Sequence, residues 1–390
     1  MLINRNKFNH LESNLSSPSI LILLGARQVG KSTLLQELLL SAKKSRRPIK
    51  TFNLELPTDL LFFNRSDLEI FTDLTLEPNA VLFFDEFHLL KNAVKLFKAI
   101  FDLKKNIKIV ASGSSSLEIH KHLRESLAGR RDVVEIYPLT LSEWSQQGLQ
   151  FEEYLLYGGL PGLVHLMKRE EKIEYLSQIV QTYILKDIRG LIREENIRAF
   201  NHLLFLLAEY QGNVVPTSNL ASEIGVTQPT VEHYLTILEQ TYVVYGVHSY
   251  ADKLANELKK SKKYYFYDLG IRNSLVKNFS ALDTREDRGV LYESLVFQEL
   301  KKRLKANVEL RFWRTKQGDE IDFLWIEDRI PVPIEVKTNA ANDRIPAGII
   351  KFLKNYPKAK IAYVVNGTRT EDVAYFDCTI RYRTPQNFEI

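Results

Sequence analysis

Nine consecutive residues combine glycines, a lysine and two hydroxyls in a pattern that can bind phosphate groups. Residues 25–33 read Gly-Ala-Arg-Gln-Val-Gly-Lys-Ser-Thr and follow an apolar run at 20–24. A G-x-x-x-x-G-K-[ST] segment between an apolar strand and a helix is typical of a loop whose amide groups surround phosphate oxygens. In such a loop Lys31 reaches the β- and γ-phosphates, and Ser32 binds the accompanying Mg²⁺. We therefore predict a nucleoside triphosphate site made by Gly25, Ala26, Arg27, Gln28, Val29, Gly30, Lys31, Ser32 and Thr33.

Two adjacent acids predict the hydrolytic part of the same site. Asp85 and Glu86 follow the apolar residues 81–84, which suit a buried central strand. Ligands of open parallel sheets bind at the carboxyl ends of the strands, where these acids would lie. We expect Asp85 to hold the Mg²⁺ shell and Glu86 to orient and polarise the attacking water. The alternative is an ordinary strand end with two solvated acids.

A hydroxyl and a guanidinium follow farther along the chain. The strand expected at 107–111 ends in a serine-rich stretch, and we assign Ser114 to contact with the γ-phosphate or the water. Serines also form turns at strand ends, which is the alternative. Arg130 and Arg131 lie between a helix and a strand, where an arginine can act on the γ-phosphate of a neighbouring subunit. That role requires a homo-oligomer, whereas a surface ion pair or a DNA phosphate contact does not.

Residues 220–235 have the spacing of a helix-turn-helix. Small Ala221 allows the two helices to cross closely, Gly225 permits the turn, and Thr227 caps the second helix. A β-rich ribbon at 242–247 follows and predicts a wing. The core-facing positions of the second helix would be Val231, Leu235 and Leu238.

Lysines beyond the ribbon favour a polyanionic partner. The exposed face of the second helix carries an acid, Glu232, and no arginine, so strong base-specific readout is not expected. Lysines bind backbone phosphates whatever the sequence. We predict DNA contacts from Gln228, Thr230, His233, Lys259, Lys260, Lys262 and Lys263. A solvated charged face and a winged helix that docks another protein are the alternatives.

A third set of residues has the pattern of a nuclease site. Glu335 and Lys337 lie two apart on a predicted strand and so share a face, which Asp322 on the preceding strand can join. Glu293, on a predicted helix, completes the set. This layout resembles the PD-(D/E)xK nucleases of the restriction-endonuclease-like fold, in which the acids bind Mg²⁺ and the lysine helps to activate water. A DNA-binding platform that does not cleave and a purely structural domain remain open.

These residues require strands that end at one edge of a sheet. The alternation of short apolar runs with amphipathic stretches predicts an α/β fold, a parallel sheet covered by helices on both faces. The expected strands are 19–24, 49–53, 81–85, 107–111 and 132–136, with helices at 31–43 and 89–104 among them. Beyond 283 we expect a helix at 287–305 and strands at 309–313, 319–326, 331–337 and 360–365.

The changes of period along the chain predict four domains. They are a P-loop core at 1–138, a helical lid at 139–195, a winged helix-turn-helix at 196–264 and an α/β nuclease-like domain at 265–390. A chain of 390 residues is long enough for several cores. Its net charge of +5 permits a nucleic-acid partner without requiring one. The lone Cys378 excludes an intramolecular disulfide, which favours a cytoplasmic setting, and no apolar run predicts a membrane span.

Several of these motifs together resemble the archaeal and bacterial AAA-type ATPases that carry a C-terminal domain of unknown function. The more particular strings are Ser-Leu-Ala-Gly-Arg at 126–130 and Gly-Gly-Leu-Pro at 158–161, and the resemblance spans nearly the whole chain. The resemblance implies that the nucleotide is ATP. It also implies that the family's ATP-binding roles belong here to Gly30, Lys31, Ser32, Asp85 and Glu86. Arg130 occupies the family's arginine position, and Arg131 is an extra neighbour.

Three functions agree with these motifs. In the first, an ATPase binds DNA, especially structured or branched DNA, and couples nucleotide state to DNA engagement. In the second, the ATPase licenses a metal-dependent nuclease. In the third, the chain is a nucleotide-switched module that docks a protein.

Overall fold

A computed structural model describes residues 3–114, 127–182, 197–250, 262–338 and 344–390. The chain divides into two compact units. Unit 1 comprises Met1–Leu139 and Gln240–Val243, and unit 2 comprises Thr140–Glu239 and Val244–Ile390. The first unit therefore ends beside the predicted end of the P-loop core.

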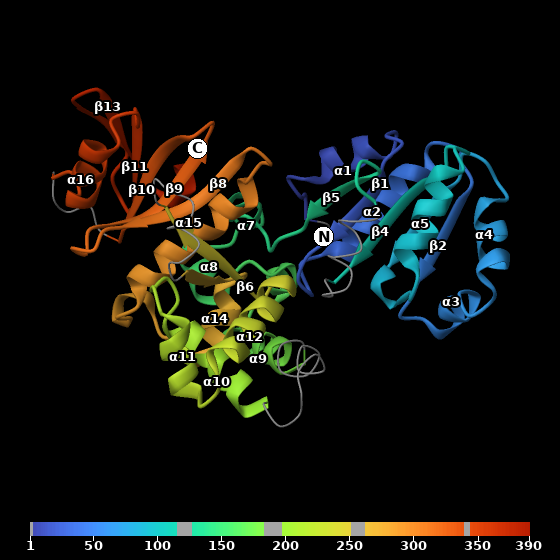
Figure 1. Ribbon diagram of the computed structural model, residues 1–390, viewed down its shortest axis with the longest axis horizontal. Helices are drawn as coiled ribbons and strands as arrows, with labels where there is room; N and C mark the ends of the chain where they lie inside the picture. Colours follow the sequence, from blue (N-terminus) through green and yellow to red (C-terminus); the bar gives the residue numbers. More distant parts are fainter. Residues whose placement is uncertain (1–2, 115–126, 183–196, 251–261, 339–343) are drawn as a thin grey trace. The chain divides into compact units, whose positions relative to one another are not determined.

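Unit 1 is built on a parallel five-stranded sheet in the order β2-β3-β4-β1-β5 (Figure 1). The strands are β1 (Ile20–Leu24), β2 (Ile49–Asn53), β3 (Val81–Asp85), β4 (Lys108–Gly113) and β5 (Arg131–Glu135), as predicted from their apolar runs. β1 pairs with both β4 and β5, so it lies inside the sheet. All residues of β1 and β4 are buried, as expected for central parallel strands.

Helices connect the strands of unit 1. They are α1 (Phe8–Asn14), α2 (Lys31–Lys43), α3 (Pro57–Phe62), α4 (Asp67–Thr75) and α5 (Ala93–Asp102). The amphipathic α2 packs across β3 and β4, and α1 packs against α2. α5 joins the core through Phe97, whose ring centroid lies 4.9 Å from that of Phe84 on β3. The sheet therefore delivers the ends of β1, β3 and β4 to one edge.

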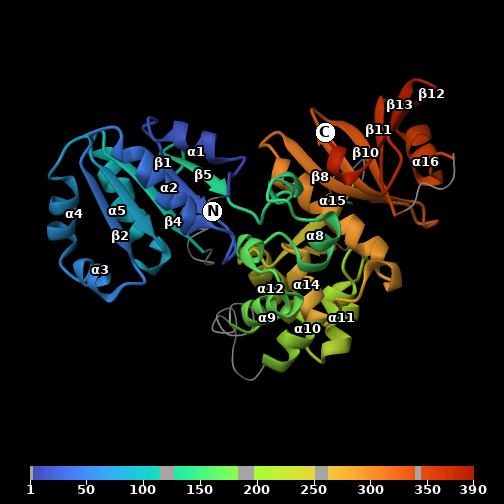
Figure 2. The ribbon, with the colours of Figure 1, turned by 180° about the vertical axis from the view of Figure 1, so that it is seen from behind.

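Unit 2 contains an eight-stranded sheet in the order β12-β13-β11-β10-β9-β8-β6-β7 (Figure 2). The strands at 309–313, 319–326, 331–337 and 360–365 are confirmed as β8 (Val308–Arg314), β9 (Glu320–Glu327), β10 (Ile330–Lys337) and β11 (Ile361–Asn366). β12 (Glu371–Tyr375) and β13 (Cys378–Arg383) extend the sheet beyond the predicted strands.

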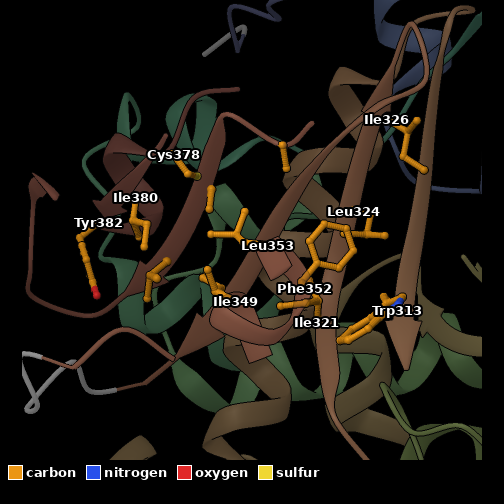
Figure 3. Close-up of a cluster of buried hydrophobic side chains, with 13 residues drawn as sticks. Trp313, Ile321, Leu324, Ile326, Ile349, Phe352, Leu353, Cys378, Ile380 and Tyr382 are labelled. Carbon is orange, nitrogen blue, oxygen red and sulfur yellow. The ribbon is translucent and has the colours of Figure 1, made fainter. Parts of the chain in front are cut away.

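Two helices cover opposite faces of this sheet. They are α15 (Arg288–Arg303) and α16 (Ala347–Asn355). Phe323 of β9 packs against Phe297 of α15, with ring centroids 6.2 Å apart. The next residue, Leu324, belongs to the apolar cluster between the sheet and α16 (Figure 3). Because successive side chains point to opposite faces of a strand, the two helices lie on opposite sides.

The predicted lid at 139–195 belongs to unit 2. Its described helices are α7 (Leu141–Ser145), α8 (Phe151–Tyr157) and α9 (Arg169–Ile179), and the last two pack against α14 (Leu269–Leu275). The buried Asp268 carboxylate accepts hydrogen bonds from the Gly159 amide, at 2.8 Å, and from α14 amides. The Gly-Gly-Leu-Pro turn therefore serves to seat α8 on α14.

The predicted wing is part of the same large sheet. The helix-turn-helix region contains α10 (Ile197–Glu209), α11 (Thr217–Ile224) and α12 (Gln228–Gln240), and the ribbon contains β6 (Val244–Ser249) and β7 (Lys263–Phe266). β6 pairs antiparallel with β7 and parallel with β8. The predicted boundary between 264 and 265 is wrong, because it cuts β7. Within the described residues, no helix is long and apolar enough to cross a membrane.

Candidate functional site

The loop after β1 has the backbone of a phosphate-binding loop. Gly30 precedes α2 in the left-handed region, at φ 93°, where glycine is favoured. Gly25 is as constrained, because a Cβ there would lie 2.2 Å from the Ile136 carbonyl oxygen. No side chain caps the first turn of α2. The amides and the positive dipole end of this helix thus face the loop.

Lys31 lies buried at the start of α2. Its Nζ donates to the carbonyl oxygens of Ala26, at 2.8 Å, and Gly25, at 3.2 Å. Burial lowers the pKa of Lys31, and the nearby charges of Glu86 and Asp85 oppose that shift. The loop therefore curls around an ammonium that both acids attract.

Asp85 ends β3 beside the end of β4. Its Oδ1 accepts a hydrogen bond from the Ser112 hydroxyl and one from the Glu86 amide, the latter at 3.2 Å. Ser112 is completely buried. These contacts fix the orientation of the Asp85 carboxylate at the edge of the sheet.

Glu86 belongs to a three-residue cluster. Its Oε2 lies 3.1 Å from His88 Nδ1 and accepts from the Ser114 amide at 3.1 Å. The Ser114 hydroxyl lies 3.4 Å from His88 Nε2. Burial by itself raises the pKa of Glu86, but His88, the Lys31 charge and the Ser114 amide outweigh it and lower the pKa to about 2. Glu86 is therefore an ionised carboxylate at neutral pH.

The candidate arginine already has an ion-pair partner. Arg130 Nε donates to Asp102 Oδ1 at 2.8 Å, and the arginine side chain is about one-third exposed. Arg131 begins β5. Ser126, the first residue of the Ser-Leu-Ala-Gly-Arg string, lies outside the described residues. The surface ion pair weighed as an alternative is thus present, and action on a neighbouring subunit remains a prediction.

These groups fit a magnesium-bound triphosphate. The donors are the loop amides and Lys31, and the exposed Ser32 hydroxyl and the Asp85 carboxylate offer the oxygen ligands that Mg²⁺ prefers. Lys31, Asp85, Glu86 and Ser114, predicted from separate segments, come together at the carboxyl edge of the sheet. Sequence reasoning missed His88, and within the serine-rich stretch that begins at Ser112 it chose Ser114 rather than Ser112.

Two helices of unit 2, α11 and α12, are joined by a short turn where the helix-turn-helix was predicted. Gly225 has φ 72° at the end of α11, and the Thr227 hydroxyl accepts from the Thr230 amide at 3.4 Å. Gln228 and His233 are exposed on α12, and Thr230 is half-buried. The predicted core positions Val231, Leu235 and Leu238 are all buried. No lysine or arginine occurs at 217–240, so α11 and α12 themselves present no cation to a phosphate.

The predicted lysine contacts require a correction. Lys259 and Lys260 lie outside the described residues. Lys262 Nζ pairs with Glu239 Oε1 at 2.9 Å, and Lys263 is buried, with a side chain only 2% exposed. Lys263 is not available to DNA, because all of β7 is buried and Lys263 Nζ pairs with Glu293 and Glu320 inside unit 2. The exposed lysine cluster inferred from the sequence is therefore wrong at Lys263.

The nuclease-like residues converge as their spacing predicted. A bulge in β9 helps: Arg311 of β8 opposes Leu324, whereas Trp313 opposes Ile321, so β9 carries one extra residue. Asp322 and Phe323 consequently face the same side, toward α15. Asp322 Oδ2 accepts from the Val336 amide at 2.8 Å.

Two buried glutamates flank Asp322. Glu293 of α15 accepts from the Tyr265 hydroxyl at 2.5 Å, and burial together with the Asp322 charge raises the pKa of Glu293 to about 7. Glu335 accepts from Lys337 Nζ at 2.7 Å, and burial and Asp322 raise the pKa of Glu335 to about 8. Burial raises the pKa of Asp322 as well. Negative charge in this cluster is therefore crowded and poorly hydrated.

The cluster does not fit the divalent metal that a nuclease site needs. Lys263 Nζ lies 3.1 Å from Glu293 Oε1 and 2.5 Å from Glu320 Oε1, so an ammonium already stands among the carboxylates. Within the described ranges, no group of three or more His, Cys, Asp or Glu side chains is arranged to hold a metal ion. Sequence reasoning missed Glu320, and it placed Lys263 on the surface.

Comparison with family models divides the chain into three. Residues 17–145 match an "AAA domain", residues 148–282 match a "domain of unknown function (DUF8612)", and residues 288–381 match a "domain of unknown function (DUF4143)". The match at 17–145 covers the five-stranded sheet. With its phosphate-binding loop, this sheet gives unit 1 the α/β fold of an AAA-type P-loop ATPase.

Relatives match over most of the chain. An uncharacterized protein of Mycobacterium tuberculosis is 26% identical over 94% of this chain and 81% of its own length. An uncharacterized protein of Methanocaldococcus jannaschii is 24% identical over 96% of this chain and 86% of its own. Among solved structures, AMPPCP-bound DnaA from Aquifex aeolicus is 15% identical over 61% of this chain and 89% of that one, with a TM-score of 0.30. That TM-score is too low to establish a shared fold.

Proposed function

We propose that unit 1 binds and hydrolyses ATP with Mg²⁺. The observation that supports this most is the meeting of three charged groups at one edge of the sheet. Lys31 stands at the loop, Asp85 is oriented by Ser112, and Glu86 is held ionised beside both. The match to an AAA domain and the resemblance of the motifs favour ATP as the nucleotide.

Each residue has a role that follows from its surroundings. The loop amides from Gly25 to Thr33 and the Lys31 ammonium would bind phosphate oxygens, which are the acceptors that these donors suit. Ser32 and Asp85 would hold Mg²⁺, which when bound supplies positive charge at the phosphates. Glu86 would accept a hydrogen bond from the attacking water and orient it, and Ser114 would hold Glu86 through its amide.

Steady-state hydrolysis of ATP tests this assignment. Glu86→Gln keeps the size of the side chain but removes its charge, so we expect kcat to fall by about 10²–10⁴-fold. Glu77→Gln, an exposed glutamate of unit 1, is the matched control and should retain wild-type turnover. If both variants hydrolyse ATP at the wild-type rate, Glu86 has no part in the reaction.

A nucleic-acid partner is the second candidate, and it concerns unit 2. The helix-turn-helix geometry of α11 and α12 favours it, with Gln228 and His233 exposed on the second helix. Because 217–240 contains no lysine or arginine, we expect contacts that follow shape rather than base sequence. ATP binding in unit 1 would then couple to DNA engagement by the chain.

Fluorescence anisotropy with single-stranded, duplex and junction DNA tests this candidate. We expect binding that weakens as salt rises, because the predicted phosphate contacts of Lys259 and Lys260, outside α11 and α12, would release counterions. The double variant Gln228→Ala/His233→Ala should bind more weakly, and Ser222→Ala, at an exposed position of α11, should not change affinity. Absence of binding to every DNA form would instead favour the protein-docking module.

A further inference from the structure

The carboxylate cluster of unit 2 contains its own cation. Four acids meet there: Glu293 from α15, Glu320 and Asp322 from β9, and Glu335 from β10. Lys263 reaches them from β7, far away in the sequence, and bonds to two of them. Its side chain is 2% exposed, so water contributes little to its solvation. The carboxylates therefore supply most of the stabilisation of its charge.

We propose that Lys263 takes the place of the divalent cation in the nuclease-like cluster, so that unit 2 carries a metal-free, non-cleaving version of that site. A buried ammonium between carboxylates meets the same electrostatic demand as a bound cation. It also blocks the shared space, because a metal would have to displace Nζ from Glu293 and Glu320.

The surroundings of Lys263 hold it in position. The Tyr265 hydroxyl, two residues along the same strand, bonds to Glu293 at 2.5 Å. The ring of Phe312 lies 5.5 Å from Lys263 Nζ, and antiparallel pairing with β6 fixes the backbone. Burial alone lowers the pKa of Lys263, but Glu293, Asp322 and Glu320 outweigh burial and raise it, which keeps the ammonium charged.

One carboxylate oxygen of the cluster has no hydrogen-bond partner among these contacts. Glu335 Oε1 bonds to Lys337, whereas Glu335 Oε2 is buried without a hydrogen-bond partner. An acid in that position is a ready metal ligand once the competing ammonium is removed. Removal of Lys263 should therefore change which cation the cluster takes.

Titration of the nucleotide-free full chain with Mn²⁺, followed by electron paramagnetic resonance, tests the proposal. We expect no Mn²⁺ site in the wild type that depends on Asp322. Lys263→Met, which keeps the length of the side chain, should gain about one Mn²⁺ per chain, because a neutral residue leaves the acids without their cation. Lys263→Arg, which keeps the charge, should not gain it, and Lys263→Met/Asp322→Asn should lose it.

Two results would overturn the proposal. One is Mn²⁺ binding by the wild type that Asp322→Asn abolishes, a measurement that needs no Lys263 variant to fold. The other is a folded Lys263→Met chain, with wild-type circular dichroism, that takes up no Mn²⁺. Asp85→Asn in parallel identifies any Mn²⁺ held by unit 1.

Discussion

At the scale of single residues, Glu86 in unit 1 and Glu335 in unit 2 have pKa values that are shifted in opposite directions. The pKa of Glu86 is lowered to about 2 despite burial, because His88, Lys31 and the Ser114 amide all favour its charged form. The pKa of Glu335 is raised to about 8 by burial and by Asp322. A carboxylate that is ionised at every physiological pH can accept a hydrogen bond from a water molecule and orient it. One that holds its proton near neutrality suits a packed interior.

The raised pKa values predict how stability depends on pH. In the folded chain Glu335 holds its proton up to about pH 8, whereas an unfolded glutamate loses it near pH 4.3. The folded state therefore binds more protons between these values. The stability contribution is complete below about pH 4 and is lost as the pH rises toward 8.

Glu335→Gln should accordingly flatten this dependence. We expect the unfolding free energy of the wild type to fall from about pH 5 to about pH 9 by more than that of the variant, with a difference on the order of 1 kcal/mol. Urea denaturation at several pH values measures it. Glu309→Gln, at an exposed glutamate of β8, is the control and should follow the wild type. Parallel curves for Glu335→Gln and wild type would contradict the raised pKa.

At the scale of elements, the sequence predicted the strands and helices whose positions follow from hydrophobic periodicity alone. The five strands of unit 1 and α2 lie where they were predicted. β1 and β3 contain the continuous apolar runs expected of parallel strands buried on both faces, whereas β2 and β5, at the edges of the sheet, are partly exposed. The clustering of Lys31, Asp85 and Glu86 followed, because the end of β3 places the two acids and the start of α2 places the lysine. β12 and β13 were missed: β12 is largely exposed, and its residues offer little hydrophobic signal.

The pairing of strands that lie far apart in the chain could not be predicted from the sequence. The ribbon at 242–247 was correctly read as β-rich, but nothing in it showed that β6 would pair with β8 as well as β7. Lys263 was misplaced for the same reason. In a lysine-rich stretch, a lysine that faces inward, such as Lys263, is identified only by the sheet that receives it. The bulge that turns Asp322 toward α15 is likewise a property of pairing.

The packing of the turn after α8 against Asp268, which precedes α14, gives a prediction at this scale. A Cβ at Gly158 would lie 2.0 Å from Asp268 Oδ1, and φ there is +81°. We expect Gly158→Ala to destabilise unit 2 by about 2–4 kcal/mol, from overpacking and backbone strain together. Gly148→Ala is a matched control, because its φ is +75° but no atom lies within 4 Å of the added carbon.

Thermal unfolding followed by circular dichroism compares the two variants. Gly148→Ala should lose only the part that comes from the left-handed backbone, about 1 kcal/mol. Equal losses in both variants would mean that Asp268 does not constrain the turn.

At the scale of the whole molecule, a unit with the fold of an AAA-type P-loop ATPase and a unit with a carboxylate cluster around Lys263 lie on one chain. We infer that ATP turnover requires a second copy if Arg130 acts across a subunit boundary, as the family resemblance implies. The ion pair between Arg130 and Asp102 offers a way to separate that role from simple surface packing.

Arg130→Ala and Asp102→Ala both remove the pair, but only the first removes the guanidinium. We expect Arg130→Ala to lower kcat by about 10³-fold or more, the loss typical of an arginine finger, and Asp102→Ala to leave kcat nearly unchanged. The wild-type rate per chain should also rise with protein concentration. Small, equal effects of the two substitutions would leave Arg130 with the surface ion pair alone.

The most direct test of the central claim is calorimetric titration of the full chain with a non-hydrolysable ATP analogue and Mg²⁺. The wild type should give a saturable heat, and Lys31→Ala should weaken binding by about tenfold or more, because it removes the charge closest to the loop. A folded wild-type chain that releases no heat, with no binding detected by equilibrium dialysis, would contradict the nucleotide site.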